Sequence, residues 1–515
     1  MLIVYHNGDK VVELADAKAI GIEECNRKSI ASVLVEVAKK FPDQILVWCH
    51  QSLKEELNIL AIDKELHHKK ILLSYNPSDV SFLDSAIGYV DPSLFVHSNK
   101  TVSFPTWQIS SMVGCVSAEV LLALHNEIPL DKNFDYFLCS LGKLLMPKGL
   151  LCYSEPQLLK KQTKSIPAKT SQYTLFRFVK QHYKSRWVFL LLFNLFLYER
   201  KFPLLPFLFA LFYKNRNNST INLEDIKVQS SKKVIDKGTV DVIIPTIGRK
   251  TYLYDVLQDL KAQTLLPTNV IIVEQNPDQG SKSELDYLTT EEWPFVIKHT
   301  FTHQAGACNA RNIALKQIKS EWAFFADDDI RIDESFIQKT FEKINYFGAK
   351  VVTLKCLQKG QNQSFSEVIQ WVTFGSGCSF VFGECLQNCK FNMGFEWGYG
   401  EDGDFGMQLR NLGQDVLYFP EPAILHLKAP VGGFRTKPVL KWHNDTVQPK
   451  PSPTIMLYQI LHHTKAQINS YKTILFFKYY THQQIKNPIR YYHYFQKQWE
   501  RSVFWANQLK QQNEV

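Results

Sequence analysis

Apolar and polar positions alternate in a regular order in the second half of the chain. Residues 239–245, 269–273 and 322–326 form short runs that are almost entirely apolar, as is typical of buried strands. Residues about 252–264 and 306–316 carry apolar side chains at helical spacing. Strands that alternate with helices predict a mostly parallel sheet with right-handed crossovers.

The third apolar run ends at three consecutive carboxylates, Asp327, Asp328 and Asp329. Ligands of open α/β sheets bind just beyond the carboxyl ends of the strands. Adjacent carboxylates repel one another unless a positive charge lies among them, and a hard divalent cation that also binds substrate phosphates is the usual partner. For the triplet alone, the simpler interpretation is a helix N-terminus, where the helix dipole favours aspartate.

Further polar residues follow the other predicted strands and helices. Glu401, Asp402 and Asp404 lie among glycines at the start of an amphipathic helix, where the dipole alone would stabilise them. His426 belongs to a short apolar strand over 423–427, and a buried core histidine is the simpler interpretation of it. The remaining polar residues at the ends of predicted elements are Thr246, Arg249, Glu274, Asn276 and Arg311.

Taken in order, these phrases resemble the family 2 glycosyltransferases with the GT-A fold. The likeness covers about residues 238–435 and is carried by VDVIIPT, IIVEQN, GACNARN, FADDD, GSGCSFVF, GEDGDFGMQLRNLG and ILH. It implies an α/β fold with a GT-A, Rossmann-like mixed sheet. It also implies a nucleotide-diphosphate sugar donor, a divalent cation (Mn²⁺ or Mg²⁺) and inversion at the anomeric carbon. The chain lacks a Q-x-x-R-W sequence and several membrane spans, which favours transfer of one sugar, or a few, over processive synthesis.

The resemblance also assigns roles to individual residues. Asp327 and Asp329 match the DxD metal pair, and His426 matches a metal ligand of some members. Asp402 matches the base that takes the acceptor's proton, Glu401 would orient it or the acceptor, and Asp404 is the second choice of base. Arg435 would close over the diphosphate. The donor-binding residues by position are Pro245, Thr246, Glu274, Asn276, Arg311, Asp327 and Asp328.

The first part of the chain, residues 1–160, predicts a second α/β domain. Two of its phrases recur later: residues 83–95 resemble 326–336, and residues 135–156 resemble 404–422. We interpret this as a weak internal duplication that left a degenerate GT-A-like domain without the metal site. A chance resemblance between two α/β units is the alternative.

The net charge of +9 is unevenly distributed. Residues 161–217 carry +10 and residues 431–515 carry +9, so the rest of the chain carries 9 − 19 = −10. The connector 161–237 contains a hydrophobic hairpin at 187–213, whose two apolar arms are each too short to span a bilayer. An interfacial hairpin on anionic lipid and a buried hairpin between domains are its two interpretations. The basic, aromatic extension 436–515 predicts helices that either contact a membrane surface, which we prefer to nucleic acid, or cap the catalytic domain.

Together these features predict a metal-dependent inverting glycosyltransferase with a saccharide or lipid-linked acceptor, in surface polysaccharide synthesis. Ten cysteines without metal spacing, and the lack of a signal peptide pattern, predict a cytoplasmic protein, peripheral on the inner face of the cell membrane. A non-catalytic scaffold that binds sugar nucleotides or glycans is one alternative. A nucleotidyltransferase is another, although only Gly248, Arg249 and Lys250 offer a phosphate loop after the first strand.

Overall fold

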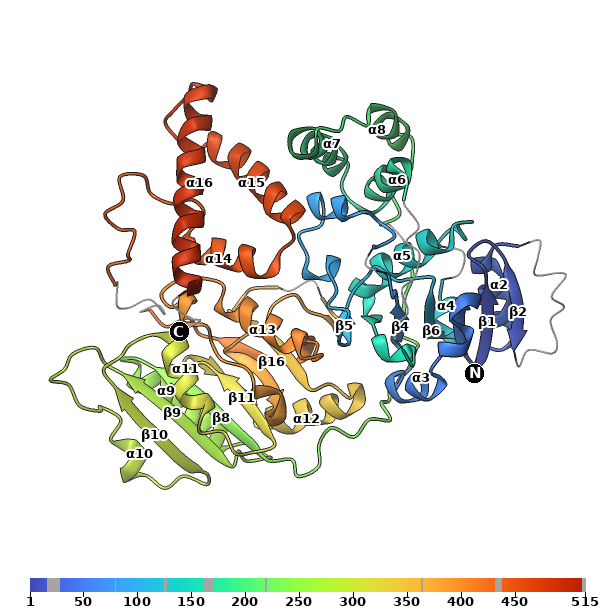
Figure 1. The fold of residues 1–515 in the computed structure, drawn as a ribbon. Coiled ribbons are helices and arrows are strands. Elements are labelled where there is room, and N and C mark those ends of the chain that lie inside the picture. Colours follow the sequence, from blue (N-terminus) through green and yellow to red (C-terminus); the bar gives the residue numbers. More distant parts are fainter. Residues whose placement is uncertain are drawn as a thin grey trace. The chain divides into compact units, whose positions relative to one another are not determined.

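The computed structural model describes two compact units (Figure 1). Unit 1 consists of Met1–Ser231 with His463–Lys478, and unit 2 consists of Lys232–His462 with Tyr479–Val515. The description covers the whole chain except residues 16–27, 79, 125–126, 162–169, 218–219, 363–364, 431–437 and 512–515.

Unit 2 is built on a nine-stranded mixed sheet in the order β10-β9-β8-β11-β15-β13-β16-β12, with β14 paired to β16. Strands β10, β9, β8 and β11 are parallel, and β15 runs antiparallel between β11 and β13. The three predicted strands are confirmed as β8, β9 and β11. The strands are β8 (Val240–Thr246), β9 (Asn269–Gln275), β10 (Val296–Thr302), β11 (Trp322–Ala326), β12 (Ile330–Arg331), β13 (Val351–Leu357), β14 (Ile369–Gln370), β15 (Cys378–Phe382) and β16 (Leu417–His426).

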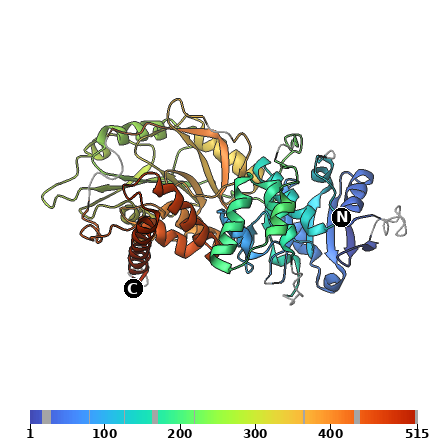
Figure 2. The same ribbon diagram turned by 90° about the horizontal axis from the view of Figure 1, so that it is seen from above.

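The helices of unit 2 include the two that the apolar spacing predicts, now bounded as α9 and α11. Helix α16, red in Figures 1 and 2, packs against α14. The helices are α9 (Lys250–Lys261), α10 (Tyr287–Thr290), α11 (Ala307–Leu315), α12 (Phe336–Phe347), α13 (Glu401–Asn411), α14 (Pro453–His462) and α16 (Pro488–Gln511).

The core of unit 2 explains why the apolar run before the aspartates forms the central strand. Every residue of β11 is buried, and the strand has sheet neighbours on both edges. Phe324 stacks on Phe380 of β15, with ring centroids 4.5 Å apart, and Trp322 contacts Phe341 of α12. Burying several aromatic side chains, each worth about 2–3 kcal/mol, fixes the strand and so the position at which the carboxylates begin.

Unit 1 is built on a seven-stranded sheet in the order β2-β1-β3-β6-β4-β7-β5. Its strands are β1 (Leu2–His6), β2 (Val11–Ala15), β3 (Ile45–His50), β4 (Ile71–Tyr75), β5 (Phe104–Pro105), β6 (Val113–Ser117) and β7 (Leu151–Ser154). Its helices are α2 (Ile30–Lys40), α3 (Ile59–Glu65), α4 (Ala118–Leu122), α5 (Phe134–Leu145), α6 (Gln172–His182), α7 (Arg186–Glu199), α8 (Leu204–Ala210) and α15 (Lys465–Tyr480).

The two sheets share a pairing pattern. In unit 1, β3 is antiparallel to β6, β6 is antiparallel to β4, β4 is parallel to β7, and β7 is antiparallel to β5. In unit 2 the same relations join β11, β15, β13, β16 and β14, and these strands occur in the same order along the chain. The parallel pair β1–β3 likewise corresponds to β8–β11. The sheets differ beyond these strands, because β2 is antiparallel to β1 but β9 is parallel to β8, and unit 2 also has β10 beside β9 and β12 beside β16.

This pattern agrees with one of the two recurring phrases. Residues 135–156 and 404–422 begin in α5 and α13 and run into the equivalent strands β7 and β16. Residues 83–95 follow β4, however, whereas residues 326–336 follow β11, whose equivalent is β3. After Cys49, the last β3 residue paired with β6, the chain continues His50-Gln51-Ser52 where β11 is followed by the aspartates.

The segments predicted as connector and extension fold with the units. Helices α6, α7 and α8 belong to unit 1, and so does most of α15, although the sequence on either side of it belongs to unit 2. Within the described ranges, no helix combines the length and the apolar character that a membrane crossing requires.

Candidate active site

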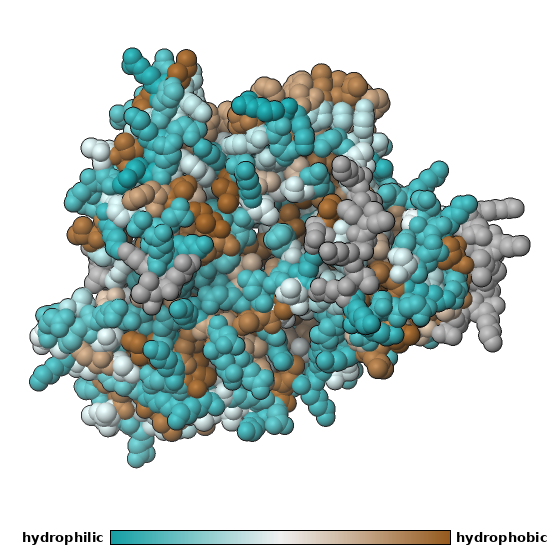
Figure 3. All heavy atoms as spheres, viewed as in Figure 1, coloured by the Kyte–Doolittle hydropathy of each residue, from teal (hydrophilic) through white to brown (hydrophobic). Residues whose placement is uncertain are grey.

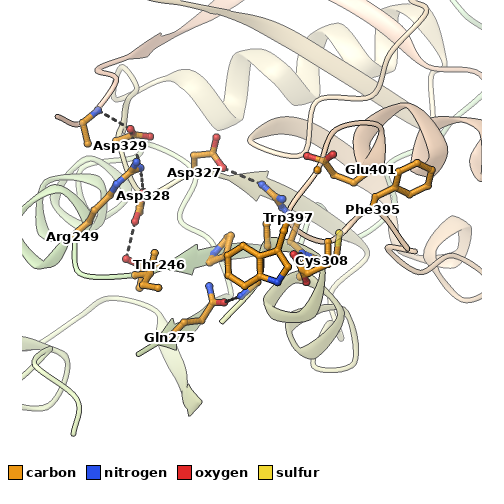
Figure 4. A pocket seen from close by; sticks show the side chains of 18 of the residues that line it. Thr246, Arg249, Gln275, Cys308, Asp327, Asp328, Asp329, Phe395, Trp397 and Glu401 are labelled. Atoms are coloured by element: carbon orange, nitrogen blue, oxygen red, sulfur yellow. Dashed lines mark hydrogen bonds and ion pairs between the residues drawn. The ribbon is translucent and has the colours of Figure 1, made fainter. Parts of the chain in front are cut away.

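A cavity of about 380 Å³ lies at the carboxyl ends of β8, β9 and β11 in unit 2 (Figure 4). Figure 4 shows the three aspartates on one side of it and Glu401 with Phe395 on the other, with the Trp397 ring between them in this view. The predicted site residues that line it are Pro245, Thr246, Arg311, Asp327, Asp328, Asp329, Glu401 and His426.

Asp328 is the structural member of the triplet. Its Oδ2 accepts a hydrogen bond from Thr246 Oγ1 at 2.7 Å, and its Oδ1 accepts one from Arg249 Nη1 at 2.5 Å. Burial raises the pKa of Asp328 to about 6, although Arg249 and Thr246 act to lower it. Both carboxylate oxygens are therefore engaged with β8 and the start of α9, which leaves the flanking aspartates to face a ligand.

Asp327, Asp329 and His426 form a cluster whose ligand atoms all lie within 4.8 Å of one another. The pairing of Ile330 with His426 between β12 and β16 brings the histidine beside the triplet. His426 Nε2 lies 3.2 Å from Asp329 Oδ1, and Asp329 Oδ2 accepts a hydrogen bond from Ala429 N at 2.9 Å. Two carboxylates and one imidazole suit Mn²⁺ or a similar divalent ion, so the residues present fit the cation that the resemblance implies.

The charges around Asp329 favour its ionised form. Burial acts to raise its pKa, but the contacts with His426, the Ala429 N–H and Arg249 outweigh this effect, and the pKa is lowered. Arg249 Nη1 lies 2.9 Å from Asp329 Oδ2, so one guanidinium contacts both Asp328 and Asp329. The hydrogen bond to Asp329 raises the pKa of His426. The ionised carboxylate of Asp329 favours a positive charge beside it, which Arg249 and His426 supply in this structure.

Glu401 and Asp402 form an acidic pair in the first turn of α13. The residue before this helix is Gly400, whose φ is 119°. Burial and the neighbouring charge of Asp402 raise the pKa of Glu401 to about 7. Burial also raises the pKa of Asp402, against the opposing effects of Arg311 and Ser376. Among the described residues Asp402 Oδ1 has no hydrogen-bond partner, although it is buried. A carboxylate oxygen with this environment is suited to accept a proton.

Arg311 connects the two acidic groups. It is buried on α11, and its Nη2 lies 3.3 Å from Asp327 Oδ1. Burial acts to lower the pKa of Arg311, but Asp327, Asp402 and Glu401 together raise it. The guanidinium thus stays charged and interacts electrostatically both with Asp327 and with the acidic pair Glu401 and Asp402.

Two glycines in the phrases that carry the family resemblance leave room for site carboxylates. A Cβ on Gly377 would lie 2.1 Å from Asp327 Oδ2, and one on Gly306 would lie 2.4 Å from the carboxylate of Glu396. Glu396 accepts hydrogen bonds from the backbone N–H groups of Cys308 and Asn309 at the N-terminus of α11. This carboxylate holds the helix that carries Arg311.

Asp404, the second choice of base, has structural partners. Its Oδ1 lies 2.7 Å from His462 Nε2 on α14, and its Oδ2 accepts a hydrogen bond from Gln408 Nε2 at 2.8 Å. Its side chain is buried and does not line the cavity. Both carboxylate oxygens of Asp404 thus have partners, whereas Asp402 Oδ1 has none among the described residues, so Asp402 is the better candidate.

Two predicted donor-binding residues lie outside the cavity wall. Glu274 Oε2 pairs with His299 Nε2 at 2.9 Å, and Asn276 Oδ1 accepts a hydrogen bond from Asp278 N in its own loop. Gln275 lines the cavity instead and accepts a hydrogen bond from Gly306 N. Successive side chains of a strand point to opposite faces, so Glu274 and Gln275 cannot both face the cavity.

Several cavity residues were not assigned to the site from sequence. Arg249 was noted as a strand-end residue and as part of a possible phosphate loop, three residues before a predicted helix, but it was given no role in the proposed site. Glu396, Trp397 and Lys428 also line the cavity, and no pattern in the sequence marked them. Asp402 lies beside Glu401 but is not itself part of the wall, and Arg435 falls outside the described residues.

Comparisons with known proteins found similarities in sequence and in structure. An uncharacterized glycosyltransferase of Haemophilus influenzae is 30% identical over 105 residues, which are 20% of this chain and 33% of that protein. The crystal structure of S. aureus TarS 1–349 is similar at 19% sequence identity with a TM-score of 0.32, over 37% of this chain and 60% of that chain. The same protein in complex with UDP-GlcNAc is similar at 18% identity with a TM-score of 0.34, over 45% of this chain and 70% of that chain. GalNAc-T7 with UDP, GalNAc and Mn²⁺ is similar at 13% identity, 37% and 44% coverage and a TM-score of 0.30.

The chain thus spans one third of the H. influenzae relative and about three fifths of TarS 1–349. The sequence model described as Glycosyl transferase family 2 matches residues 241–399. This range starts in β8 and ends just before Glu401, so it contains the aspartate triplet and Arg311. Residues 241–399 of unit 2 therefore match the family 2 glycosyltransferases, and the mixed sheet of this unit is consistent with a GT-A fold.

Proposed function

We propose that unit 2 is a metal-dependent inverting glycosyltransferase that moves a sugar from a nucleotide-diphosphate donor to a saccharide or lipid-linked acceptor. One observation carries the proposal: in the segment that matches the family 2 model, a cation-suited cluster (Asp327, Asp329 and His426) and Glu401 line the same cavity, and Asp402 lies next to Glu401. Glycosyl transfer needs these two functions, one for the leaving group and one for the acceptor.

The leaving group is a nucleoside diphosphate, which gains negative charge as the glycosidic bond breaks. Asp327, Asp329 and His426 would hold Mn²⁺ or Mg²⁺, which supplies Lewis-acid stabilisation of that charge. Arg249 and Lys428 line the same cavity and add positive charge near the diphosphate. Pro245, Thr246 and Gln275 bound the end of the cavity where β8 and β9 finish, which we assign to the nucleoside.

The acceptor hydroxyl is a weak nucleophile until a base removes its proton. We assign that role to Asp402, because its Oδ1 is buried without a partner among the described residues and Arg311 favours its ionised form. Glu401 lines the cavity and orients the acceptor. A single in-line attack by the acceptor oxygen inverts the anomeric carbon, so the reaction needs no covalent intermediate on the enzyme.

The sequence and strand pairing of unit 1 indicate a different role from that of unit 2. We infer that it is a degenerate GT-A-like domain that acts as a scaffold, because it shares the strand pairing of unit 2 but has His50-Gln51-Ser52 where unit 2 has the aspartates. Loss of the carboxylates removes the cation site while the sheet persists, since the sheet depends on its apolar strands.

We further propose that the reaction belongs to surface polysaccharide synthesis at the inner face of the cell membrane. The net positive charge of residues 161–217 and the exposed apolar side chains of α7 and α8 support a peripheral contact with lipid. A lipid-linked acceptor would be presented at such a surface.

A transfer assay tests the proposed chemistry. Purified full-length protein is incubated with a panel of nucleotide sugars, saccharide and lipid-linked acceptors and Mn²⁺, and the anomeric configuration of the product is read by NMR. We expect one donor to give an inverted product, with a loss of about 100-fold or more in kcat for Asp402→Asn. Asp43→Asn, an exposed change in unit 1, is the matched control. A retained configuration, or full activity in Asp402→Asn, would contradict the assignment.

A further inference from the structure

Helices α7 and α8 of unit 1 expose an unusually large number of big apolar side chains. The α7–α8 surface comprises Phe189, Phe193 and Phe196 on α7 with Leu205, Phe209 and Phe212 on and after α8. Phe212 is 87% exposed, Leu205 60% and Phe209 58%. Figure 3 shows apolar side chains gathered over these two helices, at the top of the view. A contiguous apolar patch on a folded protein marks a contact with another molecule or a membrane.

The patch is not the packing face of α7. That helix buries Val188, Leu191 and Leu195 against the core of unit 1, while Phe189 and Phe193 lie on its other side. A surface helix of a globular protein is normally polar on its outer face, and a helix that is apolar all round is buried or in contact with lipid.

Buried hydrogen bonds fix which face of α7 is turned outward. Asn194 is fully buried, and Thr473 Oγ1 of α15 donates a hydrogen bond to its Oδ1 at 2.8 Å. Ser470 Oγ of α15 lies 3.4 Å from Asn194 Nδ2 and donates to Tyr89 O. A rotation of α7 about its axis that buried its phenylalanines would break these hydrogen bonds. Each polar group left unpaired in the core would lower the free energy of unfolding by about 1–3 kcal/mol.

Positive charge surrounds the apolar side chains. Lys184 and Arg186 lie at the start of α7, Arg200 and Lys201 in the turn between the helices, and Lys214 after α8; all five are exposed. The single acidic residue between positions 180 and 214 is Glu199, and it pairs with Lys201 at 2.8 Å. An apolar protein partner would not require this charge, whereas an anionic bilayer offers both hydrocarbon and negative headgroups.

The helices are too short to cross a bilayer. Helix α7 has 14 residues and α8 has 7, so α7 is about 21 Å long at 1.5 Å per residue, against a hydrocarbon core of about 30 Å. We propose that the α7–α8 surface enters the headgroup region of an anionic membrane and lies in its plane. This surface would provide the membrane contact that is part of the proposed function. Only its benefit to catalysis, which is access to a lipid-linked acceptor, rests on the proposed glycosyl transfer.

Vesicle co-sedimentation of the full-length protein tests this inference. The vesicles are phosphatidylcholine alone and phosphatidylcholine with phosphatidylglycerol. The apolar variant is Leu205→Ser, Phe209→Ser, Phe212→Ser, and the charge variant is Lys184→Gln, Arg186→Gln, Lys214→Gln. The control is Leu60→Ser with Ile489→Ser, which removes exposed apolar side chains elsewhere (81% and 68% exposed).

We expect wild type and the control to bind the anionic vesicles, and the apolar variant to bind about tenfold or more weakly. The charge variant should lose its preference for anionic over neutral vesicles, and added salt should reproduce that loss in wild type. Failure of wild type to bind either vesicle would overturn the inference. So would a wild-type dimer in light scattering that becomes monomeric in the apolar variant, because the occupant would then be a second copy of the chain.

Transfer to a soluble acceptor separates this inference from the proposed function. We expect the apolar variant to retain wild-type turnover with a soluble saccharide acceptor, since the altered side chains lie outside the cavity wall. Turnover by a wild-type protein that does not bind vesicles would contradict only the proposed membrane surface. Vesicle binding by a wild-type protein that shows no turnover would contradict only the proposed glycosyl transfer.

Discussion

His462 Nε2 lies 2.7 Å from Asp404 Oδ1, and this contact joins α14 to the helix that carries Glu401 and Asp402. Both side chains are at least nine-tenths buried, so water does not weaken the interaction. The neighbouring Gly403 lies so close to the Tyr458 ring of α14 that an added Cβ would be 2.7 Å from it. Helix α14 thereby fixes the first turn of α13, where the acidic pair stands.

Removing this contact should loosen the acidic pair without touching the donor. For His462→Ala we expect a fall of about 1–3 kcal/mol in the free energy of unfolding, because a buried charge-assisted hydrogen bond is lost. We also expect kcat to fall while the KM for the donor changes little. Thermal melts and steady-state kinetics measure both effects, with the exposed His443→Ala as control. A variant with raised donor KM and unchanged kcat would refute this positioning role.

Arg249 should compete with a cation for the metal-side carboxylates. Its guanidinium contacts Asp328 and Asp329, so it neutralises charge that a cation would otherwise meet. We therefore predict that Arg249→Gln binds Mn²⁺ several-fold more tightly than wild type in the absence of donor. Isothermal calorimetry with Mn²⁺ alone measures this affinity. Lys250→Gln, which removes a charge paired with Asp286 outside the cavity, is the control, and weaker binding by Arg249→Gln would show that the arginine supports the site.

Gly377 leaves the space that Asp327 occupies, because a Cβ there would lie 2.1 Å from Asp327 Oδ2. Gly377→Ala should displace the carboxylate and weaken Mn²⁺ binding about tenfold or more, as changes next to metal ligands commonly do. Gly280→Ala is the matched change, since its Cβ would meet only Asp278 at an ordinary 3.7 Å. Equal Mn²⁺ affinity of the two variants in calorimetry would show that Asp327 is not a ligand.

The buried Glu401 should make stability depend on pH. Its pKa rises from 4.5 in the unfolded chain to about 7 in the folded one, so between these values the folded protein keeps a proton that the unfolded chain has lost. The contribution of Glu401 to stability therefore falls as pH rises through this window and is most unfavourable above about pH 7.

Glu401→Gln should remove that dependence. We expect the variant and wild type to be similarly stable near pH 4.5, and the variant to be more stable by about 2 kcal/mol near pH 8. Chemical denaturation at several pH values, without donor or metal, gives the comparison, and Glu55→Gln on the surface of unit 1 is the control. A stability difference that stays constant with pH would mean that Glu401 is not held protonated by its surroundings.

Local sequence signals were sufficient for strands β8, β9 and β11 of the sheet. The apolar run of β11 is typical of a buried strand, and the rule that ligands bind at strand ends led to the expectation that the aspartates and Thr246 lie close together. The phrases around Gly306 and Gly377 were informative because each glycine makes room for a carboxylate.

Other features depend on contacts that no local pattern encodes. Whether Glu274 or Gln275 faces the cavity depends on the register of β9, which a one-residue shift reverses. His462 meets Asp404 across 58 positions of sequence, and α15 leaves unit 2 to complete unit 1, so neither relation follows from composition or periodicity. Residues 83–95 resemble residues 326–336 in sequence, but the two segments do not occupy equivalent positions in the two sheets. Strand pairing makes β3 the equivalent of β11, whereas residues 83–95 follow β4.

We propose that Asp329 and its neighbours hold the cation through which a nucleotide-sugar donor binds. The most direct test is calorimetric binding of a panel of nucleotide sugars to wild type and Asp329→Ala, with Mn²⁺ and with chelator. We predict that one donor binds wild type with Mn²⁺, and that both chelator and Asp329→Ala abolish this binding while Asp402→Asn preserves it. Donor binding that is equally tight in Asp329→Ala, or absent from wild type in every metal tested, would contradict the account.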